Sequence, residues 1–395
     1  MKKPTLETIV LLFFMFSAVA AQKDSLVDDN FQFAEKQLTN MLNTIGNSET
    51  NPRATDKDGS LVLVKSGDWT SGFFPGCLWY TYEYTKDDKM KTAAEFFTNN
   101  VEDQQYNGTT HDMGFKMYCS FGNGYRLTGN EHYKDVLIQS AKTLITRFNP
   151  VVGCIRSWDH HEEQWAYPVI IDNMMNLELL FWATKATGDS TFYKIAVTHA
   201  NTTLKNHFRP DYSTYHVISY DTLTGKVEKR ETHQGYANES CWARGEAWAL
   251  YGYTMCYRET KDKRYLEQAE HIAHYVLTNK NLPDDMVPYW DYNAPDIPNE
   301  PRDASAAAVM ASALYELSTY ADKDNKEKYK SAADKMLTSL SSPAYRAKLG
   351  ENNDFILMHS TGSKPADSEV DVPIIYADYY FLEANLRRLQ VEGKL

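Results

Sequence analysis

A short polar turn that recurs along the chain constrains the fold more than any other feature of its 395 residues. Each copy reads Thr, then Gly or Lys, then Asp or Asn, with an apolar residue one helical turn later. On both sides of the turn, apolar residues recur every three to four positions, which is the period of an amphipathic helix. The Asp or Asn suits the N-cap of the second helix, so each turn predicts two antiparallel helices. The copies begin at Thr85, Thr128, Thr187 and Thr260, with a looser one at Ala321–Asp324.

Six helical pairs account for most of the chain. The last apolar segment, Val372 to Leu389, has no full copy of the turn, and a helix between Asn30 and Ile45 is expected to be its partner. No segment alternates strand with helix, so the predicted fold class is all-α. An open solenoid would need polar terminal repeats, whereas the last segment is apolar on most faces. We therefore predict one closed domain over residues 21–395, an (α/α)6 barrel or toroid of six helical hairpins.

The first twenty residues have a different pattern. Lys2 and Lys3 precede an apolar run from Ile9 to Phe16, and Ala18-Val19-Ala20 supplies small residues at cleavage spacing. This pattern is typical of a secretory signal peptide, and the run is shorter than the roughly 20 residues that cross a bilayer. No Cys follows the small residues. We predict a signal peptide over 1–20, a periplasmic or secreted protein, and no membrane anchor after cleavage.

Charge and cysteine content exclude several classes of partner. The formal net charge is −12, which argues against nucleic acid because nothing would neutralise its phosphates. The five Cys have no zinc-like spacing and are expected to be buried free thiols, and we expect no metal and no cofactor. The consecutive pair His160-His161 is expected in a solvated loop. Aromatic residues make up 13% of the chain, which suits stacking on sugar rings as well as core packing. We expect a monomer or homodimer.

Polar and aromatic residues gather where the first helix of each pair is expected to begin. In a ring of helical pairs these starts meet at one mouth, where unpaired N–H groups and helix dipoles favour an anion. The segments are 67–69 (GDW), 111–115 (HDMGF), 171–173 (IDN), 242–246 (WARGE), 302–303 (RD) and Asp371.

Among the Asp residues at these starts, two are expected to be more than N-caps. Asp303 and Asp371 are well explained as caps. Asp112 and Asp172 lie beside aromatic residues and Met that would exclude water, and His111 precedes the first of them. Two carboxylates in one apolar-walled pocket have pKa values that move apart, which suits acid–base chemistry.

The Trp residues divide by their surroundings. Those within helical runs are expected in the core, and those in loops with polar neighbours favour a platform for sugar. The first group is Trp79, Trp182 and Trp248, and the second is Trp69, Trp158 and Trp242.

Taken together, these segments resemble glycoside hydrolase family 88, the unsaturated glucuronyl hydrolases. The resemblance runs from about Trp69 to Leu386 and rests on GDWTSGFFPG, HDMGF, SWDHHEEQW, IIDNMMN, THQGY, SCWARGEAW and DVPIIYADYYFLEA. It implies an (α/α)6 barrel, Asp172 as catalytic acid and base, and Asp112 as the second essential carboxylate. The substrate contacts that it implies are Trp69, His111, Phe115, Asn149, Trp158, His216, His233, Gln234, Trp242, Arg244 and Trp248.

The resemblance implies hydration of a double bond rather than ordinary glycoside hydrolysis. Polysaccharide lyases leave a C4=C5 double bond in the non-reducing-end uronate of glycosaminoglycan fragments. Family members protonate C4 and add water at C5, and the resulting hemiketal opens to release the uronate as a keto-acid. One Asp can serve both steps, as a donor when neutral and as a base when ionised. The alternatives are an unsaturated rhamnogalacturonyl hydrolase acting on pectin fragments and a non-catalytic glycan-binding protein of an uptake system.

Two further hypotheses concern anionic groups of the substrate. Arg244, between two Trp residues, is expected to bind the anionic end, with a salt bridge to Glu239 or Glu246 as the structural alternative. The loop HSTGSKPADSEV precedes the sixth inner helix, and Ser360, Ser363 and Lys364 are expected to accept a sulfate on the neighbouring sugar. Family members that accept sulfated fragments look similar here, and a solvated turn is the alternative.

Overall fold

The structure is a computed structural model that describes residues 24–395. The predicted signal peptide therefore lies outside the described residues. Within residues 24–395, no helix combines the length and apolar character needed to cross a bilayer.

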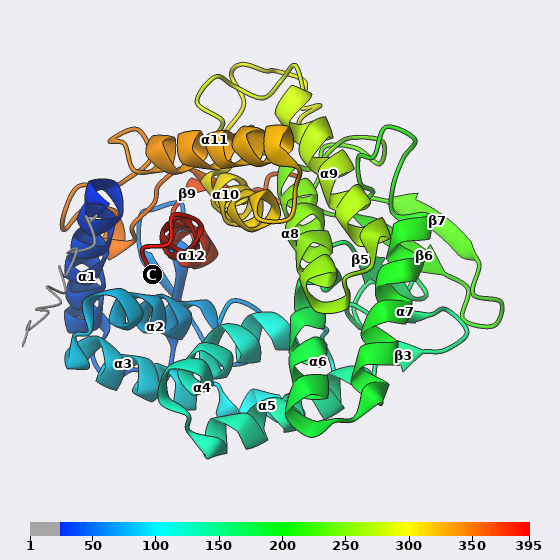
Figure 1. Ribbon diagram of the computed structural model, residues 1–395, viewed down its shortest axis with the longest axis horizontal. Helices are drawn as coiled ribbons and strands as arrows, with labels where there is room; N and C mark the ends of the chain where they lie inside the picture. Colours follow the sequence, from blue (N-terminus) through cyan, green and yellow to red (C-terminus); the bar gives the residue numbers. More distant parts are fainter. Residues whose placement is uncertain (1–23) are drawn as a thin grey trace, which may run out of the picture.

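The helices form two concentric rings (Figure 1). The inner ring consists of α2 (Phe73–Thr85), η2 (Gly114–Gly122) continued by α4 (Asn123–Thr128), α6 (Asn173–Thr187), α8 (Ala243–Thr260), α10 (Ala304–Ser318) and α12 (Ile375–Val391). The outer ring consists of α1 (Ser25–Ile45), α3 (Asp88–Asn99), α5 (Glu131–Ile145), α7 (Ser190–Asn206), α9 (Lys263–Thr278) and α11 (Lys323–Leu340). Helix α1 packs against both α2 and α12, which closes the ring. The predicted (α/α)6 barrel is confirmed.

The repeated turn joins each inner helix to its outer partner. Its Gly or Lys takes the left-handed conformation that ends the inner helix, with φ of 58–75°. The Thr hydroxyl accepts the N–H of the Asp or Asn at 3.1–3.3 Å. That Asp or Asn then caps the outer helix through its side chain, as predicted. The capping residues are Asp87, Asn130, Asp189, Asp262 and, in the looser copy, Asp322.

The loops before the inner helices contain short strands, so the expectation of helices alone is incomplete. The strands form four small antiparallel sheets, and they are only two to five residues long, too short for an alternating pattern to stand out. They are β1 (Asn51–Thr55) with β2 (Leu61–Val64), β3 (Phe148–Asn149) with β4 (Cys154–Ile155), β5 (Pro168–Ile170) with β6 (Val217–Tyr220) and β7 (Val227–Glu231), and β8 (Ser360–Ser363) with β9 (Ser368–Val372). Two 3-10 turns, η1 (Glu102–Tyr106) and η3 (Asn352–Asp354), complete the described elements.

The second inner element starts as a π-helix, η2, instead of an α-helix. At its start, Gly114 lies so close to α6 that a Cβ there would come within 2.6 Å of the Asn176 Cα atom. The Phe115 N–H donates to Asn176 Oδ1 at 3.0 Å. Only glycine allows this approach, and π-turns often occur at functional sites.

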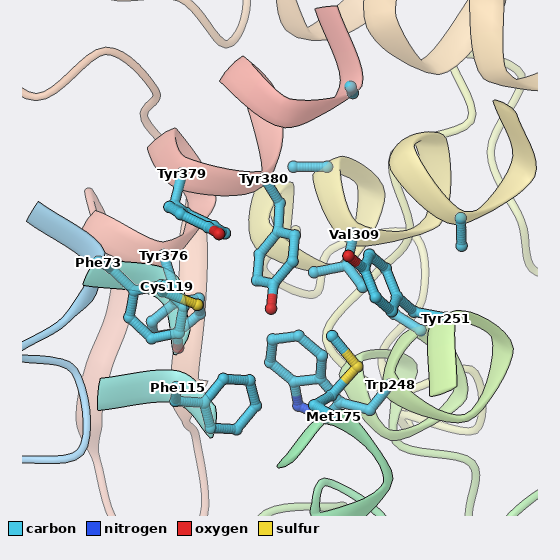
Figure 2. Close-up of a cluster of buried hydrophobic side chains, with 14 of the residues drawn as sticks. Phe73, Phe115, Cys119, Met175, Trp248, Tyr251, Val309, Tyr376, Tyr379 and Tyr380 are labelled. Carbon is cyan, nitrogen blue, oxygen red and sulfur yellow. The ribbon is translucent and has the colours of Figure 1, made fainter. Parts of the chain in front are cut away.

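Aromatic side chains fill the axis of the barrel (Figure 2). Five buried rings, from Phe73, Phe115, Trp248, Tyr376 and Tyr380, lie in contact across it; we call them the aromatic floor. Ring centroids are 5.4 Å apart for Phe73 and Phe115, 5.2 Å for Phe115 and Trp248, and 5.4 Å for Trp248 and Tyr380. The floor divides the mouth, where the inner elements begin, from the opposite end of the barrel. All five Cys are buried free thiols, as expected.

Candidate active site

Buried polar atoms without a partner gather at the mouth. A buried polar group that lacks a hydrogen bond is costly, so a cluster of such atoms indicates that a ligand supplies the partners. The cluster at the mouth comprises His111 Nδ1, Trp158 Nε1, Asp172 Oδ2, His216 Nε2, Trp248 Nε1, Ser360 Oγ, Ser363 Oγ and Tyr376 Oη. All of these residues except Tyr376 were predicted from the sequence as site residues.

The opposite end of the barrel also holds a cavity, of about 610 Å³. Its charged side chains satisfy one another instead of pointing at empty space. Arg387 pairs with Glu316 at 2.9 Å and with Glu383 at 3.6 Å, and Arg258 pairs with Glu316 at 3.0 Å and also with Glu178. We therefore place the functional site at the mouth.

Asp172 occupies the N-cap position of α6 but does not cap the helix. Its backbone is helical, with φ −56° and ψ −26°, and its side chain accepts no N–H of the first turn. Strand pairing holds it in place, because Ile170 pairs with Val217 and the Ile171 N–H donates to the His216 carbonyl at 3.1 Å. In contrast, Asp303 caps α10 through Ser305 N–H at 3.1 Å, as predicted. The carboxyl of Asp172 is therefore free for chemistry.

The surroundings of Asp172 bring the pKa of its carboxyl close to neutral pH. Burial raises the pKa of Asp172 from 3.8 to about 7, and the charge of Asp112 adds a small further rise. The positive fields of His111 and Arg244 oppose this effect without cancelling it. A carboxyl with this pKa can donate a proton and take one back under the same conditions.

Asp112 is held in the opposite protonation state. Burial raises the pKa of Asp112, but His111, Thr110 and Lys116 outweigh it, so the net shift is downward. His111 Nε2 lies 3.2 Å from one carboxylate oxygen, and the Thr110 hydroxyl donates to the other. The pKa values of the two carboxyls therefore shift in opposite directions, as the sequence predicted.

His216 faces Asp172 with a defined ring nitrogen. Its Nδ1 accepts two backbone N–H groups, from His233 at 3.1 Å and from Gln234 at 3.2 Å. Burial holds the pKa of His216 well below its usual range, so the ring is neutral and its single proton is on Nε2. That Nε2–H lies 3.7 Å from Asp172 Oδ2. The backbone of the THQGY segment thus sets the tautomer beside the catalytic candidate.

Arg244 is fully buried, and its partners differ from those considered at the sequence level. It pairs with Asp303 at 2.8 Å, and not with Glu239 or Glu246. Its guanidinium also donates to the carbonyls of Thr361 and Gly362, each at 2.6 Å. Arg244 therefore holds β8 against the barrel. Its positive charge also lowers the pKa of Asp172.

Trp69 and Trp158, in loops before inner helices, each lie in a cluster of aromatic rings. Half-buried Trp69 contacts Phe115 at 5.5 Å and Tyr376 at 5.0 Å between ring centroids. On another side, half-buried Trp158 stacks on His160 at 4.9 Å and lies 5.6 Å from His233. Trp69 and Trp158 thus present partly open surfaces, as expected of sugar platforms.

Two residues predicted to contact substrate, Trp242 and Asn149, have structural roles instead. Trp242 is 3% exposed and packs on His216 and Arg244, both at 4.5 Å, so it supports the site and is not an open platform. Asn149 Oδ1 accepts the N–H of Val151 at 2.8 Å, which caps the β3–β4 turn.

The N-cap prediction for Asp371 is wrong. This residue lies in β9 with φ 58° and pairs with His359 at 2.7 Å, while α12 begins later, after Ile374. Lys364 is also paired, with Glu300 at 3.0 Å, a residue that is distant in the sequence.

Sequence reasoning missed two residues of the mouth. Thr110 binds Asp112. Tyr376 has a buried hydroxyl without a partner, and its ring centroid lies 5.4 Å from Arg244 Cζ. The signal for Tyr376 was its place at the start of the sixth inner helix, inside a motif that was read mainly as helix core.

Two carboxyls whose pKa values shift in opposite directions lie among aromatic surfaces at one mouth of a helical barrel. This arrangement defines an enzyme that acts on carbohydrate by acid–base chemistry. Comparison with known proteins agrees. The model of Glycosyl Hydrolase Family 88 matches residues 41–387, and the chain belongs to this family.

Several relatives and solved structures are similar to this chain over most of its length. The chain is 51% identical to an unsaturated glucuronyl hydrolase of Formosa agariphila, over 93% of this chain and 92% of that one. It is 34% identical to an unsaturated chondroitin disaccharide hydrolase of Streptococcus agalactiae, over 91% of each chain. A crystal structure of an unsaturated glucuronyl hydrolase specific for heparin superposes with a TM-score of 0.91 at 50% identity, covering 94% of this chain and 99% of that one. These findings confirm the predicted family, fold and enzyme class, a glycoside hydrolase with unsaturated glucuronyl hydrolase activity.

Proposed function

We propose that this enzyme hydrates the C4=C5 double bond of the unsaturated uronate at the non-reducing end of glycosaminoglycan fragments, with Asp172 as acid and base. The observation that carries the assignment is the carboxyl of Asp172, which is buried, unpartnered at Oδ2 and has a pKa raised to about 7. An ordinary Asp would be almost fully ionised at that pH and could not donate.

The first step transfers the proton of neutral Asp172 to C4. Positive charge then develops at C5 and the ring oxygen, and the ionised Asp112 nearby favours that charge. His216 Nε2–H faces Oδ2 of Asp172, so Oδ2 is favoured as the oxygen that accepts from His216. The proton that Asp172 donates to C4 is therefore assigned to Oδ1.

The second step uses the carboxylate that the first step leaves. Ionised Asp172 takes a proton from a water molecule while the oxygen of that water bonds to C5. Between the two proton transfers, His216 Nε2–H stabilises the carboxylate of Asp172. The product at C5 is a hemiketal. Without help from the protein, its C5–O5 bond breaks to give a ketone at C5 and a hemiacetal at C1. The hemiacetal then collapses to an aldehyde, which breaks the C1–O bond and releases the keto-acid and the rest of the fragment.

For the substrate, we propose uronate–hexosamine fragments produced by lyases, with heparin-derived fragments first. The structure at 50% identity belongs to an enzyme specific for heparin, and a variant of the Streptococcus agalactiae enzyme, 32% identical with a TM-score of 0.79, has dGlcA-GalNAc6S bound. Ser360 and Ser363 have buried hydroxyls without partners, and Lys364 follows them. We assign these three residues to a sulfate on the second sugar.

An assay on unsaturated disaccharides from heparin and chondroitin lyases tests the reaction. The ultraviolet absorbance of the double bond should disappear, and in deuterium oxide the keto-acid should carry deuterium at C4. Cleavage that leaves the absorbance intact would mean ordinary glycoside hydrolysis and would refute hydration.

A substitution of the loop cation tests sulfate recognition. Lys364→Ala should lower kcat/KM for sulfated disaccharides about tenfold or more relative to unsulfated ones, because a charge-assisted bond is lost. Equal losses for both substrates would remove the loop from sulfate recognition.

A further inference from the structure

The ammonium of Lys364 is bound to a carboxylate that the protein itself holds in place. Lys364 Nζ lies 3.0 Å from Glu300 Oε2, and the Glu300 side chain is only 4% exposed. The indole N–H of Trp290 donates to the same oxygen at 2.9 Å, and the Asp296 N–H donates to the other at 3.2 Å. Glu300 is therefore fixed, whereas Lys364, at 38% exposed, still reaches solvent.

The pair lies beside the mouth because β8 is fastened to it. The Gly362 carbonyl accepts from Arg244 at 2.6 Å and from Gln234 Nε2 at 3.0 Å. Ser363 and Lys364 follow directly, so their positions are set by two residues of the site. The neighbouring hydroxyls of Ser360 and Ser363 are free to donate to a ligand.

This arrangement offers hydroxyl donors and a cation whose charge is already balanced. A sulfate that bonds to Lys364 Nζ would lie within several ångströms of the Glu300 carboxylate, in a partly desolvated place. Attraction to the ammonium and repulsion from the carboxylate then oppose each other. Glu300 is ionised here, because the bonds from Trp290 and Lys364 outweigh the effect of burial and lower its pKa.

We propose that Glu300 is a specificity-determining residue that weakens the hold of this loop on sulfate, so that the enzyme accepts unsulfated as well as sulfated fragments. The inference rests on the proposed role of Ser360, Ser363 and Lys364. The carboxylate of Glu300 repels the sulfate that these three residues attract, and such repulsion is a common way to set specificity.

The variant Glu300→Gln tests this directly. It keeps the shape and an acceptor for Trp290 but removes the charge. The measured quantity is kcat/KM for a sulfated disaccharide divided by kcat/KM for its unsulfated counterpart. This ratio should rise about three- to tenfold in the variant, the effect expected when one like charge near a bound anion is removed. The gain should shrink at high salt, since it depends on charge.

Two controls separate charge from structure. Trp290→Phe loosens Glu300 but leaves its charge, so the ratio should stay near the wild-type value. Glu95→Gln removes the same charge from an exposed pair with Lys91, 4.0 Å apart on an outer helix, and should not change the ratio. A rise in Trp290→Phe equal to that in Glu300→Gln would overturn the electrostatic role.

The outcomes also separate this inference from the proposed function beneath it. If Lys364→Ala lowers the ratio and Glu300→Gln does not raise it, sulfate recognition stands and the role of Glu300 is refuted. If neither variant changes the ratio, the loop does not contact sulfate and both proposals fall. Thermal unfolding of each variant shows whether the protein is folded, and the unsulfated substrate measures how much functional enzyme remains.

Discussion

Replacing Asp172 by Asn should nearly abolish turnover and, at the same time, make the protein more stable at alkaline pH. Burial raises the pKa of Asp172 from 3.8 to about 7. At pH 7 about half of the molecules then carry the proton, against roughly one in a thousand for an ordinary Asp. Asn can neither donate nor accept this proton, so the loss in kcat should be about 10⁴-fold or more, because one group serves two steps.

The sign of the stability effect follows from the same pKa. Between about pH 4 and pH 7 the Asp ionises in the unfolded chain but stays protonated in the folded one, so its contribution to the free energy of unfolding falls as pH rises. Above pH 7 the accumulated cost reaches about 4 kcal/mol. Asp172→Asn should therefore unfold at higher urea concentration than wild type at pH 8, and at a similar concentration at pH 4.

Two assays together check this reasoning. The first is loss of double-bond absorbance, measured from pH 5 to pH 9, where wild-type kcat/KM should fall as pH rises past about 7. The second is urea unfolding of both proteins at pH 4 and pH 8. A variant that keeps a tenth of wild-type activity would move the catalytic role elsewhere, first to Asp112. A variant without added stability at pH 8 would show that the carboxyl is not desolvated.

Four further substitutions, at three residues, test the neighbours of this carboxyl. Asp112→Asn removes a charge that raises the pKa of Asp172, so the fall in kcat/KM at high pH should begin earlier, by less than about one pH unit, and an unmoved profile would refute the coupling. His216→Phe removes the N–H that faces Asp172 and should lower kcat about tenfold or more, with a smaller change in KM; steady-state kinetics that show only a higher KM would make His216 a binding residue. Arg244→Lys should raise KM about tenfold, since one ammonium cannot replace a fork that serves Asp303 and two carbonyls. Arg244→Met should lower the free energy of unfolding by about 3–5 kcal/mol because Asp303 is left unpaired, and an unchanged urea midpoint would contradict this.

The helical ring could be predicted because each position of the repeated turn has one physical task. At Thr187-Gly188-Asp189, the Thr hydroxyl accepts an N–H, the Gly ends one helix and the Asp begins the next. Such local chemistry is legible in sequence. The strands at the mouth were missed because two to five residues carry too little alternation, and β5 pairs with β6 across the intervening helices α6 and α7.

The site shows the same division between local and distant causes. Asp172 stood out because its neighbours in the chain are apolar, and its pKa is indeed set mainly by burial. The partner of Arg244 could not be predicted in this way. Nearby Glu239 and Glu246 were considered, but closure of the ring brings Asp303 to it from 59 residues away. Glu300 likewise reaches Lys364 only because two loops meet at the mouth.

The aromatic floor gives the barrel the shape of a blind cup. Phe115 and Trp248 touch across the axis at 5.2 Å between ring centroids, and each is almost completely buried. A polysaccharide therefore cannot thread through; only its tip can descend to the carboxyl of Asp172, while the remaining sugars stay outside the rim. Both products must leave through the same opening by which the next fragment enters. Such a protein removes only the terminal uronate of each fragment, and its throughput depends on how quickly the cup empties.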